Sequence, residues 1–214
     1  MFYVSEEYYT QKKEEVLDII NGQEYELVTK EVFDKISDTK TPQGILALVK
    51  RPEYTLKKLE KVENPMLMVL ENLQDPGNLG TIIRSSEAAG VTAVILSKDT
   101  VDIFNPKVIR ATMGSIFRVP FILNQDMEEL VLWLKEKKIT TYAAHLEGKD
   151  FYQEDLRKPT AFFIGNEGNG LSTELTKAAD KKIKIPMSGS VESLNAAIAA
   201  TILAYEGKRQ RWIS

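Results

Sequence analysis

The chain has 214 residues, of which 43% are hydrophobic and 28% charged, and its formal net charge at pH 7 is −3. This balance is typical of a globular protein with a buried core in one or two domains, and the negative net charge argues weakly against a nucleic-acid partner. With no cysteine and one histidine, the sequence excludes disulfide and thiolate metal sites and argues against a transition-metal site. It has no membrane-length apolar segment, and we expect a cytoplasmic protein.

Residues 1–50 predict a small α/β unit. Strands are expected at 2–5 and 25–28, helices at 6–20 and 30–36, and a buried strand at 45–49. About 50 residues make a thin core, so this unit either packs on the rest of the chain or is part of a larger domain. Residues 51–65 are charged and bounded by prolines, and they predict a linker.

From residue 66 to the end, apolar runs alternate with helical patterns, which predicts an α/β fold with a mainly parallel sheet and helices on both faces. The expected strands are 66–70, 91–97, 119–123, 139–145, 160–165 and 181–186. The expected helices before the last one are 79–90, 105–114, 126–138 and 171–180.

The last helix, 193–207, is rich in alanine and should be buried on more than one side. Its apolar face is expected to contain Leu194, Ile198, Thr201, Ile202 and Tyr205, which recur at helical spacing. Polar residues crowd its first turn. They either bind a polar or anionic ligand or simply cap the helix, through Ser190 or Ser193.

Three loops that follow predicted strands are rich in glycine, asparagine and serine. They are ENLQDPGNLG, GNEGNGLS and PMSGSVESLN. Ligands of parallel sheets bind at the carboxyl ends of strands, so the three loops predict one site. GNEGNGLS lacks the Gly-Lys-Ser/Thr of a Walker loop, and a plain turn remains the alternative for it.

Arg84 is the only charge on one face of the helix 79–90. It shares that face with Thr81, Ser85 and Ala88, opposite an apolar face. A catalytic arginine and an ordinary solvated arginine both fit this pattern.

Together, ENLQDPGNLGTIIRSSEAAG, FFIGNEGNGLS and IPMSGSVESLNAAIAATILAYE resemble the three signature motifs of the SPOUT superfamily, in its SpoU/TrmH branch of RNA ribose 2′-O-methyltransferases. KVIRATMGSIFRVP is similar to a family segment between the first two motifs. Residues 1–50, above all TPQGILALV, resemble the later part of the family's substrate-recognition domain, without its opening helix and strand.

The resemblance implies a trefoil-knotted methyltransferase domain over residues 66–214, a homodimer, and S-adenosylmethionine as cofactor. Small residues on the helix 193–207 and on the helix of Arg84 predict that these two helices form the dimer contact. By motif, cofactor contacts are expected at Gly165, Ile185, Met187 and Leu194. The family's polar active-site positions match Asn78, Arg84, Glu167, Ser193 and Asn195. His145 matches none of these positions and is expected to be structural.

The implied reaction is methyl transfer to a ribose hydroxyl, which needs alignment and stabilisation of the developing alkoxide. An arginine is almost never deprotonated in a protein, so Arg84 is expected to act as a cation rather than as a base. The preferred substrate is ribosomal RNA, with transfer RNA as the second choice. Two alternatives stay open: an enzyme acting on a nucleotide or phosphorylated metabolite, and a non-catalytic RNA-binding module.

Overall fold

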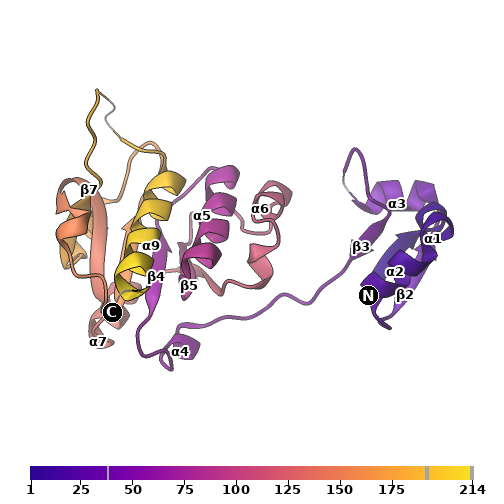
Figure 1. The fold of residues 1–214 in the computed structure, drawn as a ribbon, viewed down its shortest axis with the longest axis horizontal. Coiled ribbons are helices and arrows are strands. Elements are labelled where there is room, and N and C mark those ends of the chain that lie inside the picture. The colour runs from indigo at the N-terminus through magenta and orange to yellow at the C-terminus, as the bar shows by residue number, and fades with distance from the viewer. Residues whose placement is uncertain (38, 191–192, 213–214) are drawn as a thin grey trace. The chain divides into compact units, whose positions relative to one another are not determined.

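The computed structural model describes residues 1–37, 39–190 and 193–212. The chain divides into two compact units, Met1–Glu53 and the part from Tyr54 onward. Figure 1 shows the elements of both units, and each unit is described by itself below.

The unit Met1–Glu53 is a three-stranded sheet with the order β2-β1-β3. Strand β1 runs parallel to β2 and antiparallel to β3. Val4, Val16 and Ile20 form its buried cluster. The elements are β1 (Phe2–Ser5), α1 (Glu6–Gln11), α2 (Lys13–Ile20), β2 (Tyr25–Val28), α3 (Lys30–Ser37) and β3 (Ile45–Ala47).

Two sequence predictions for this unit are wrong in detail. The helix expected over 6–20 is broken at Lys12, whose φ of −138° lies outside the helical region. The strand expected to be buried over 45–49 ends at Ala47, and the side chains of Leu48 and Val49 are 65% and 61% exposed. Among the described residues, β3 pairs with β1 alone, so this edge strand has no second neighbour there to continue the sheet.

The second unit contains a six-stranded sheet with the order β6-β5-β4-β8-β7-β9, and all of its recorded strand pairs are parallel. This confirms the predicted fold class. Its strands are β4 (Met66–Leu70), β5 (Ala93–Ser97), β6 (Phe121–Gln125), β7 (Thr140–Asp150), β8 (Thr160–Ile164) and β9 (Lys181–Lys184).

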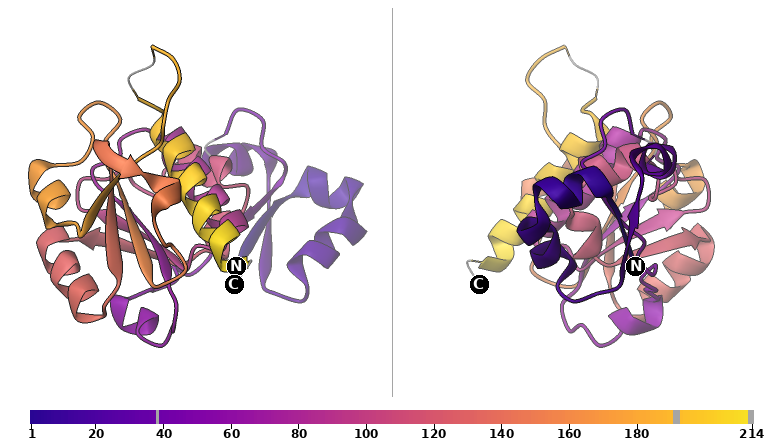
Figure 2. Two further views of the ribbon diagram at one scale, coloured as in Figure 1. Left: turned by 60° about the vertical axis from the view of Figure 1, so that its left-hand side comes forward. Right: turned by 90° about the vertical axis from the view of Figure 1, so that its right-hand side faces the viewer.

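Helices cover both faces of this sheet (Figure 2). Successive residues of β4 point to opposite faces, so Met68 packs with α5, α6 and α9, whereas Leu67 and Val69 pack with α4, α7 and α8. The α-helices are α4 (Leu56–Leu59), α5 (Pro76–Ala89), α6 (Pro106–Ala111), α7 (Met127–Glu136), α8 (Thr173–Ala178) and α9 (Ala196–Trp212), with short 3₁₀ helices at Ser115–Phe117 and Phe151–Gln153.

Helix α5 begins three residues earlier than the sequence predicted. Asp75 is its N-cap and accepts a hydrogen bond from the Asn78 N–H at 2.7 Å, and Pro76 takes the first helical position. Asn78 therefore lies in the first turn of the helix and not in the preceding loop. Within the stretch 51–65, expected as a linker, α4 buries Leu59 against the sheet.

The prediction for the last helix is wrong about its start and its buried face. It begins at Ala196, where the Asn195 side chain, rather than Ser190 or Ser193, accepts the Ala197 and Ile198 N–H groups at 2.9 and 3.3 Å. Ile198 and Tyr205, expected on the buried face, are 52% and 46% exposed. Instead, small residues let α9 approach the sheet and α5 closely. Its buried residues are Ala197, Ala200, Leu203, Ala204 and Gly207.

Candidate functional site

The site lies where the two central strands β4 and β8 end side by side. Leu70 pairs with Ile164, and the Glu71 N–H donates to the Ile164 carbonyl at 2.9 Å. After β4 the chain continues outward to β5 and β6, whereas after β8 it runs in the other direction, past β7 to β9. Such a reversal of strand order leaves a crevice at the carboxyl ends of the strands, which is where two of the three predicted loops lie.

Glu71 anchors these two loops, and sequence reasoning missed it. Its carboxylate is buried and accepts two hydrogen bonds of 2.7 Å, from the Ser172 N–H and from the Ser172 hydroxyl. The Ser172 hydroxyl in turn accepts the Leu175 N–H as the N-cap of α8. An acidic residue placed directly after five buried apolar residues was the signal that could have identified it.

The loop after β8 folds back on itself, and Gly165 is required for that turn. Asn166 and Gly170 exchange two backbone hydrogen bonds of 2.9 Å. A Cβ atom on Gly165 would lie 2.1 Å from the Gly170 carbonyl carbon, closer than any side chain can approach backbone. From the sequence, this loop could be part of a ligand site or a plain turn. In the structure, Gly165 first lets its own loop close.

Glu167, at the tip of this loop, binds the N-terminus of α5. Its carboxylate accepts the Gln74 and Asp75 N–H groups at 3.1 and 3.0 Å and the Asn78 side-chain amide at 2.9 Å. Partial burial raises the pKa of Glu167, but these hydrogen bonds outweigh it and hold the pKa below its ordinary value. The carboxylate is thus stabilised in its charged form, which suits a positioning role better than that of a general base near neutral pH.

Asn78 continues the same network to α9. Its side-chain oxygen accepts a hydrogen bond of 2.9 Å from Nδ2 of Asn195, whose own oxygen caps α9. Glu167, Asn78 and Asn195, predicted from three separate motifs, therefore form one continuous chain of hydrogen bonds. It joins the loop after β8 to the first turns of α5 and α9.

Arg84 lies six residues after Asn78, which is about 9 Å farther along α5. Its side chain is exposed and makes no hydrogen bond or ion pair with any residue that the structure describes. The helix face opposite Arg84 is buried, as predicted, and its buried residues include Leu79, Ile82, Ile83 and Ser86. Arg84 stands outside the lining of the cavity described next.

A cavity of about 390 Å³ opens beside this network, between the middle of β7 and the loops that follow β8 and β9. All four residues expected to contact a cofactor line it, and so do Glu167 and Ser193. Apolar side chains and the backbone of the glycine-rich loop supply most of the wall. Among the lining residues are Ala144, Gly165, Ile185, Met187, Leu194 and Leu203. Residues 191–192, within the third predicted loop, lie outside the described residues.

His145, which was expected to be structural because it matches no motif position, also lines the cavity. It lies on β7, and its Nδ1 accepts the backbone N–H of Glu147 at 3.2 Å. A neutral imidazole bonded in this way carries its proton on Nε2, which leaves a donor for a ligand. Across the described ranges, no group of three or more histidine or acidic side chains is arranged to hold a metal ion.

Comparison with known proteins gives two family matches. Residues 65–205 match the SpoU rRNA methylase family, and residues 2–55 match the family model for RNA 2′-O ribose methyltransferase substrate binding. The chain is 36% identical to the 23S rRNA (guanosine(2553)-2′-O)-methyltransferase RlmP of Bacillus subtilis, over 88% of this chain and 74% of the relative. It is 33% identical to the 23S rRNA (guanosine-2′-O-)-methyltransferase RlmB of Shewanella oneidensis, over 89% and 80%.

Solved structures agree with these matches. The SpoU methyltransferase AviRb from Streptomyces viridochromogenes, in complex with the cofactor AdoMet, superposes with a TM-score of 0.85 at 29% identity, covering 100% of this chain and 83% of that one. The AdoMet-bound rRNA methyltransferase from Sinorhizobium meliloti gives a TM-score of 0.83 at 32% identity, covering 97% and 78%.

Proposed function

The chain belongs to the SpoU rRNA methylase family, and we propose that it transfers a methyl group from S-adenosylmethionine to a ribose 2′-hydroxyl of ribosomal RNA. One observation carries this proposal. The cavity beside the glycine-rich loop is joined, through Glu167, Asn78 and Asn195, to the helix that presents Arg84. A single hydrogen-bonded network thereby joins the proposed cofactor site to the helix that carries an exposed cation.

The cavity fits S-adenosylmethionine in size and in chemistry. Its volume of about 390 Å³ falls within the range of small-molecule sites, roughly 300–1,000 Å³. Ile185, Met187 and Leu194 offer apolar contacts, and the loop that begins at Gly165 offers backbone groups. When bound there, the cofactor supplies an electrophilic methyl group.

Arg84 acts on the RNA in this proposal. Its guanidinium stays charged, orients a phosphate of the target nucleotide and stabilises the alkoxide that develops on the ribose oxygen. Glu167, Asn78 and Asn195 are positioning residues, because their polar groups bind one another and the ends of α5 and α9. Ser193, exposed at the rim of the cavity, is proposed to contact the substrate.

The two alternatives left open by the sequence are not favoured. Named relatives that match most of this chain are rRNA 2′-O-methyltransferases, and neighbouring structures hold AdoMet. A non-catalytic RNA-binding module would not need a cofactor cavity, and the residues predicted to contact a cofactor line one here.

A homodimer and the trefoil knot remain proposals from the family resemblance, and a cytoplasmic location remains a proposal from the composition of the sequence. The exposed apolar residues Ile198 and Tyr205 on α9 support a dimer contact on that helix. Ala200 and Ala204 on the same helix are buried inside the chain, so a dimer test changes the exposed Ile198 and Tyr205. Light scattering of an Ile198→Asp, Tyr205→Asp variant should report a monomer. A wild-type monomer at micromolar concentration would contradict the dimer.

Two measurements test the proposed function. Calorimetry should show S-adenosylmethionine binding to the purified chain, without comparable binding of ATP or NAD. Mapping of 2′-O-methylated positions in ribosomal RNA, with and without the gene, should reveal one position that depends on it. Identical maps, or preferential ATP or NAD binding, would reject the proposal in favour of a small-molecule enzyme.

A further inference from the structure

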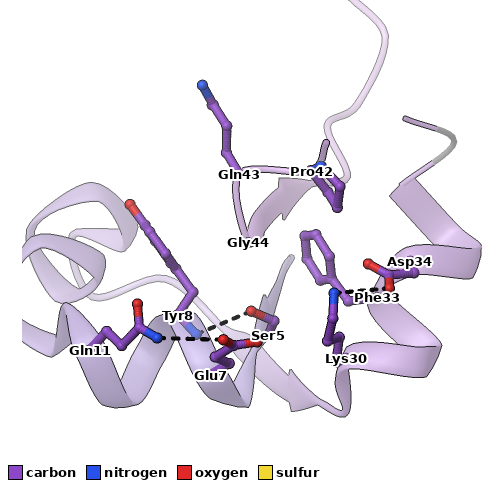
Figure 3. Close-up of a pocket in the computed structure, with 10 residues that line it drawn as sticks. All are labelled: Ser5, Glu7, Tyr8, Gln11, Lys30, Phe33, Asp34, Pro42, Gln43 and Gly44. Atoms are coloured by element: carbon purple, nitrogen blue, oxygen red, sulfur yellow. Dashed lines mark hydrogen bonds and ion pairs between the residues drawn. The ribbon is translucent and has the colours of Figure 1, made fainter. Parts of the chain in front are cut away.

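A second cavity, of about 200 Å³, lies in the unit Met1–Glu53 (Figure 3). It opens at the carboxyl ends of the parallel strands β1 and β2, which end at Ser5 and Val28. Helix α1 follows one strand and α3 follows the other. Strand β3 lies antiparallel on the far side of β1. The strand-end crevice of an α/β sheet is a common place for ligands.

The walls of this cavity come from three segments. Figure 3 shows Tyr8 and its neighbours on α1 at one side, Phe33 and its neighbours on α3 at the other, and Pro42–Gly44 crossing between them. Gly44 has a φ of +92°, and a Cβ atom there would lie 2.5 Å from the Tyr8 Cβ. Only glycine lets this segment turn so tightly against α1, and the turn places Gln43 at the rim of the cavity, with its side chain extending outward in Figure 3.

The polar groups of the cavity suit the edge of a nucleobase better than a phosphate. The Gln43 amide is exposed and makes no hydrogen bond with any described residue, so its donor and its acceptor are both available. The one cation, Lys30, is paired with Asp34 at 3.2 Å, and Glu7 adds a second carboxylate. Two carboxylates beside one paired lysine repel a phosphate, whereas an open amide can bind a base edge through two hydrogen bonds.

We propose that this cavity takes one unpaired nucleobase of the substrate RNA and that Gln43 reads its edge. The inference rests on the proposed function, and it assigns RNA recognition to particular residues. The unit lies within the match to the substrate-binding family model, residues 2–55. Sequence-specific RNA recognition mostly targets bases splayed out of single strands, which are held by apolar walls and by hydrogen bonds at their edges.

The test compares three variants of the full chain. Gln43→Ala removes the amide, and Gln43→Glu keeps its length but replaces the donor with a negative charge. Gln23→Ala is the matched control, because Gln23 is an exposed glutamine of the same unit that does not line the cavity. The probe is unmodified 23S ribosomal RNA transcribed in vitro, with Kd measured by filter binding at one fixed salt concentration.

Both Gln43 variants should raise the Kd for RNA by about 10-fold, within the range of one two-pronged base contact, and Gln23→Ala should leave it unchanged. Their melting temperatures and their single-turnover rates at saturating RNA should match the wild type. Equal Kd values for Gln43→Ala and the wild type would overturn the nucleobase site alone. A wild type that transfers no methyl group to RNA at any concentration would reject the proposed function, and this inference with it.

Discussion

The side chains of Asn78 and Asn195, 117 residues apart in sequence, share a hydrogen bond of 2.9 Å from Nδ2 of Asn195 to Oδ1 of Asn78. Each asparagine also binds at a helix N-terminus, Asn78 in the first turn of α5 and Asn195 as the cap of α9. Because Glu167 binds Asn78 as well, the loop after β8 and the N-termini of α5 and α9 are held against one another. The proposed catalytic geometry depends on this bond.

Asn195→Asp isolates the contribution of that bond. Aspartate caps a helix as well as asparagine does, so the melting temperature should change little, but its carboxylate cannot donate to Asn78. Loss of one positioning hydrogen bond, about 1 kcal/mol, should slow single-turnover methyl transfer roughly 5-fold. Asn195→Ala should in addition lower stability by about 0.5–2 kcal/mol through the lost cap. An aspartate variant with the wild-type rate would remove Asn195 from the network that supports catalysis.

Glu167 predicts a particular pH dependence of stability. Its pKa in the folded protein lies below its ordinary value, so the stability it contributes is present above about pH 4.3 and is lost as the pH falls through the folded-state pKa. The difference in melting temperature between the wild type and Glu167→Gln should therefore be largest above about pH 5 and should shrink below pH 4. Glu128→Gln is the control, because its exposed carboxylate accepts no hydrogen bond from any described residue. A wild-type advantage that grows on acidification would contradict this assignment.

Alanine substitutions at Gly165 and Gly168 test whether the glycine-rich loop needs glycine at one particular position. An alanine at 165 would collide with the backbone of Gly170, whereas the Cβ of an alanine at 168 would meet nothing closer than 3.5 Å. Gly165→Ala should cost about 1–3 kcal/mol in stability and weaken S-adenosylmethionine binding at least 10-fold. Gly168→Ala should change stability by no more than about 0.5 kcal/mol. Calorimetry and chemical denaturation measure both, and equal affinities would show that the loop tolerates a side chain at 165.

The strands of the second unit were predicted well from the sequence, but the buried face of its last helix was not. Strands such as Met66–Leu70 are buried on both faces and therefore read as unbroken apolar runs. The prediction of the buried face of α9 was wrong because helical periodicity assumes that large residues face the core. In the structure, Ala200, Ala204 and Gly207 allow close packing, and Ile198 is exposed.

The contacts between side chains far apart in the sequence could not be predicted. The motifs identified Glu167, Asn78 and Asn195, but periodicity and spacing carry no information about which of them touch. The contacts of Glu71 and His145 likewise follow from the way strands are ordered in the sheet, and a single sequence does not reveal that order.

The most direct test is single-turnover transfer of labelled methyl from S-adenosylmethionine to unmodified ribosomal RNA, followed by digestion to nucleosides, for wild type, Arg84→Ala and Arg110→Ala. The label should appear on the ribose 2′-oxygen of one nucleoside. Arg84→Ala should slow transfer about 100- to 1,000-fold, equivalent to roughly 3–4 kcal/mol in the barrier, with stability changed by no more than about 0.5 kcal/mol. Arg110→Ala, which removes another exposed arginine, should stay near the wild-type rate. Label on a base, or full activity in folded Arg84→Ala, would contradict the account.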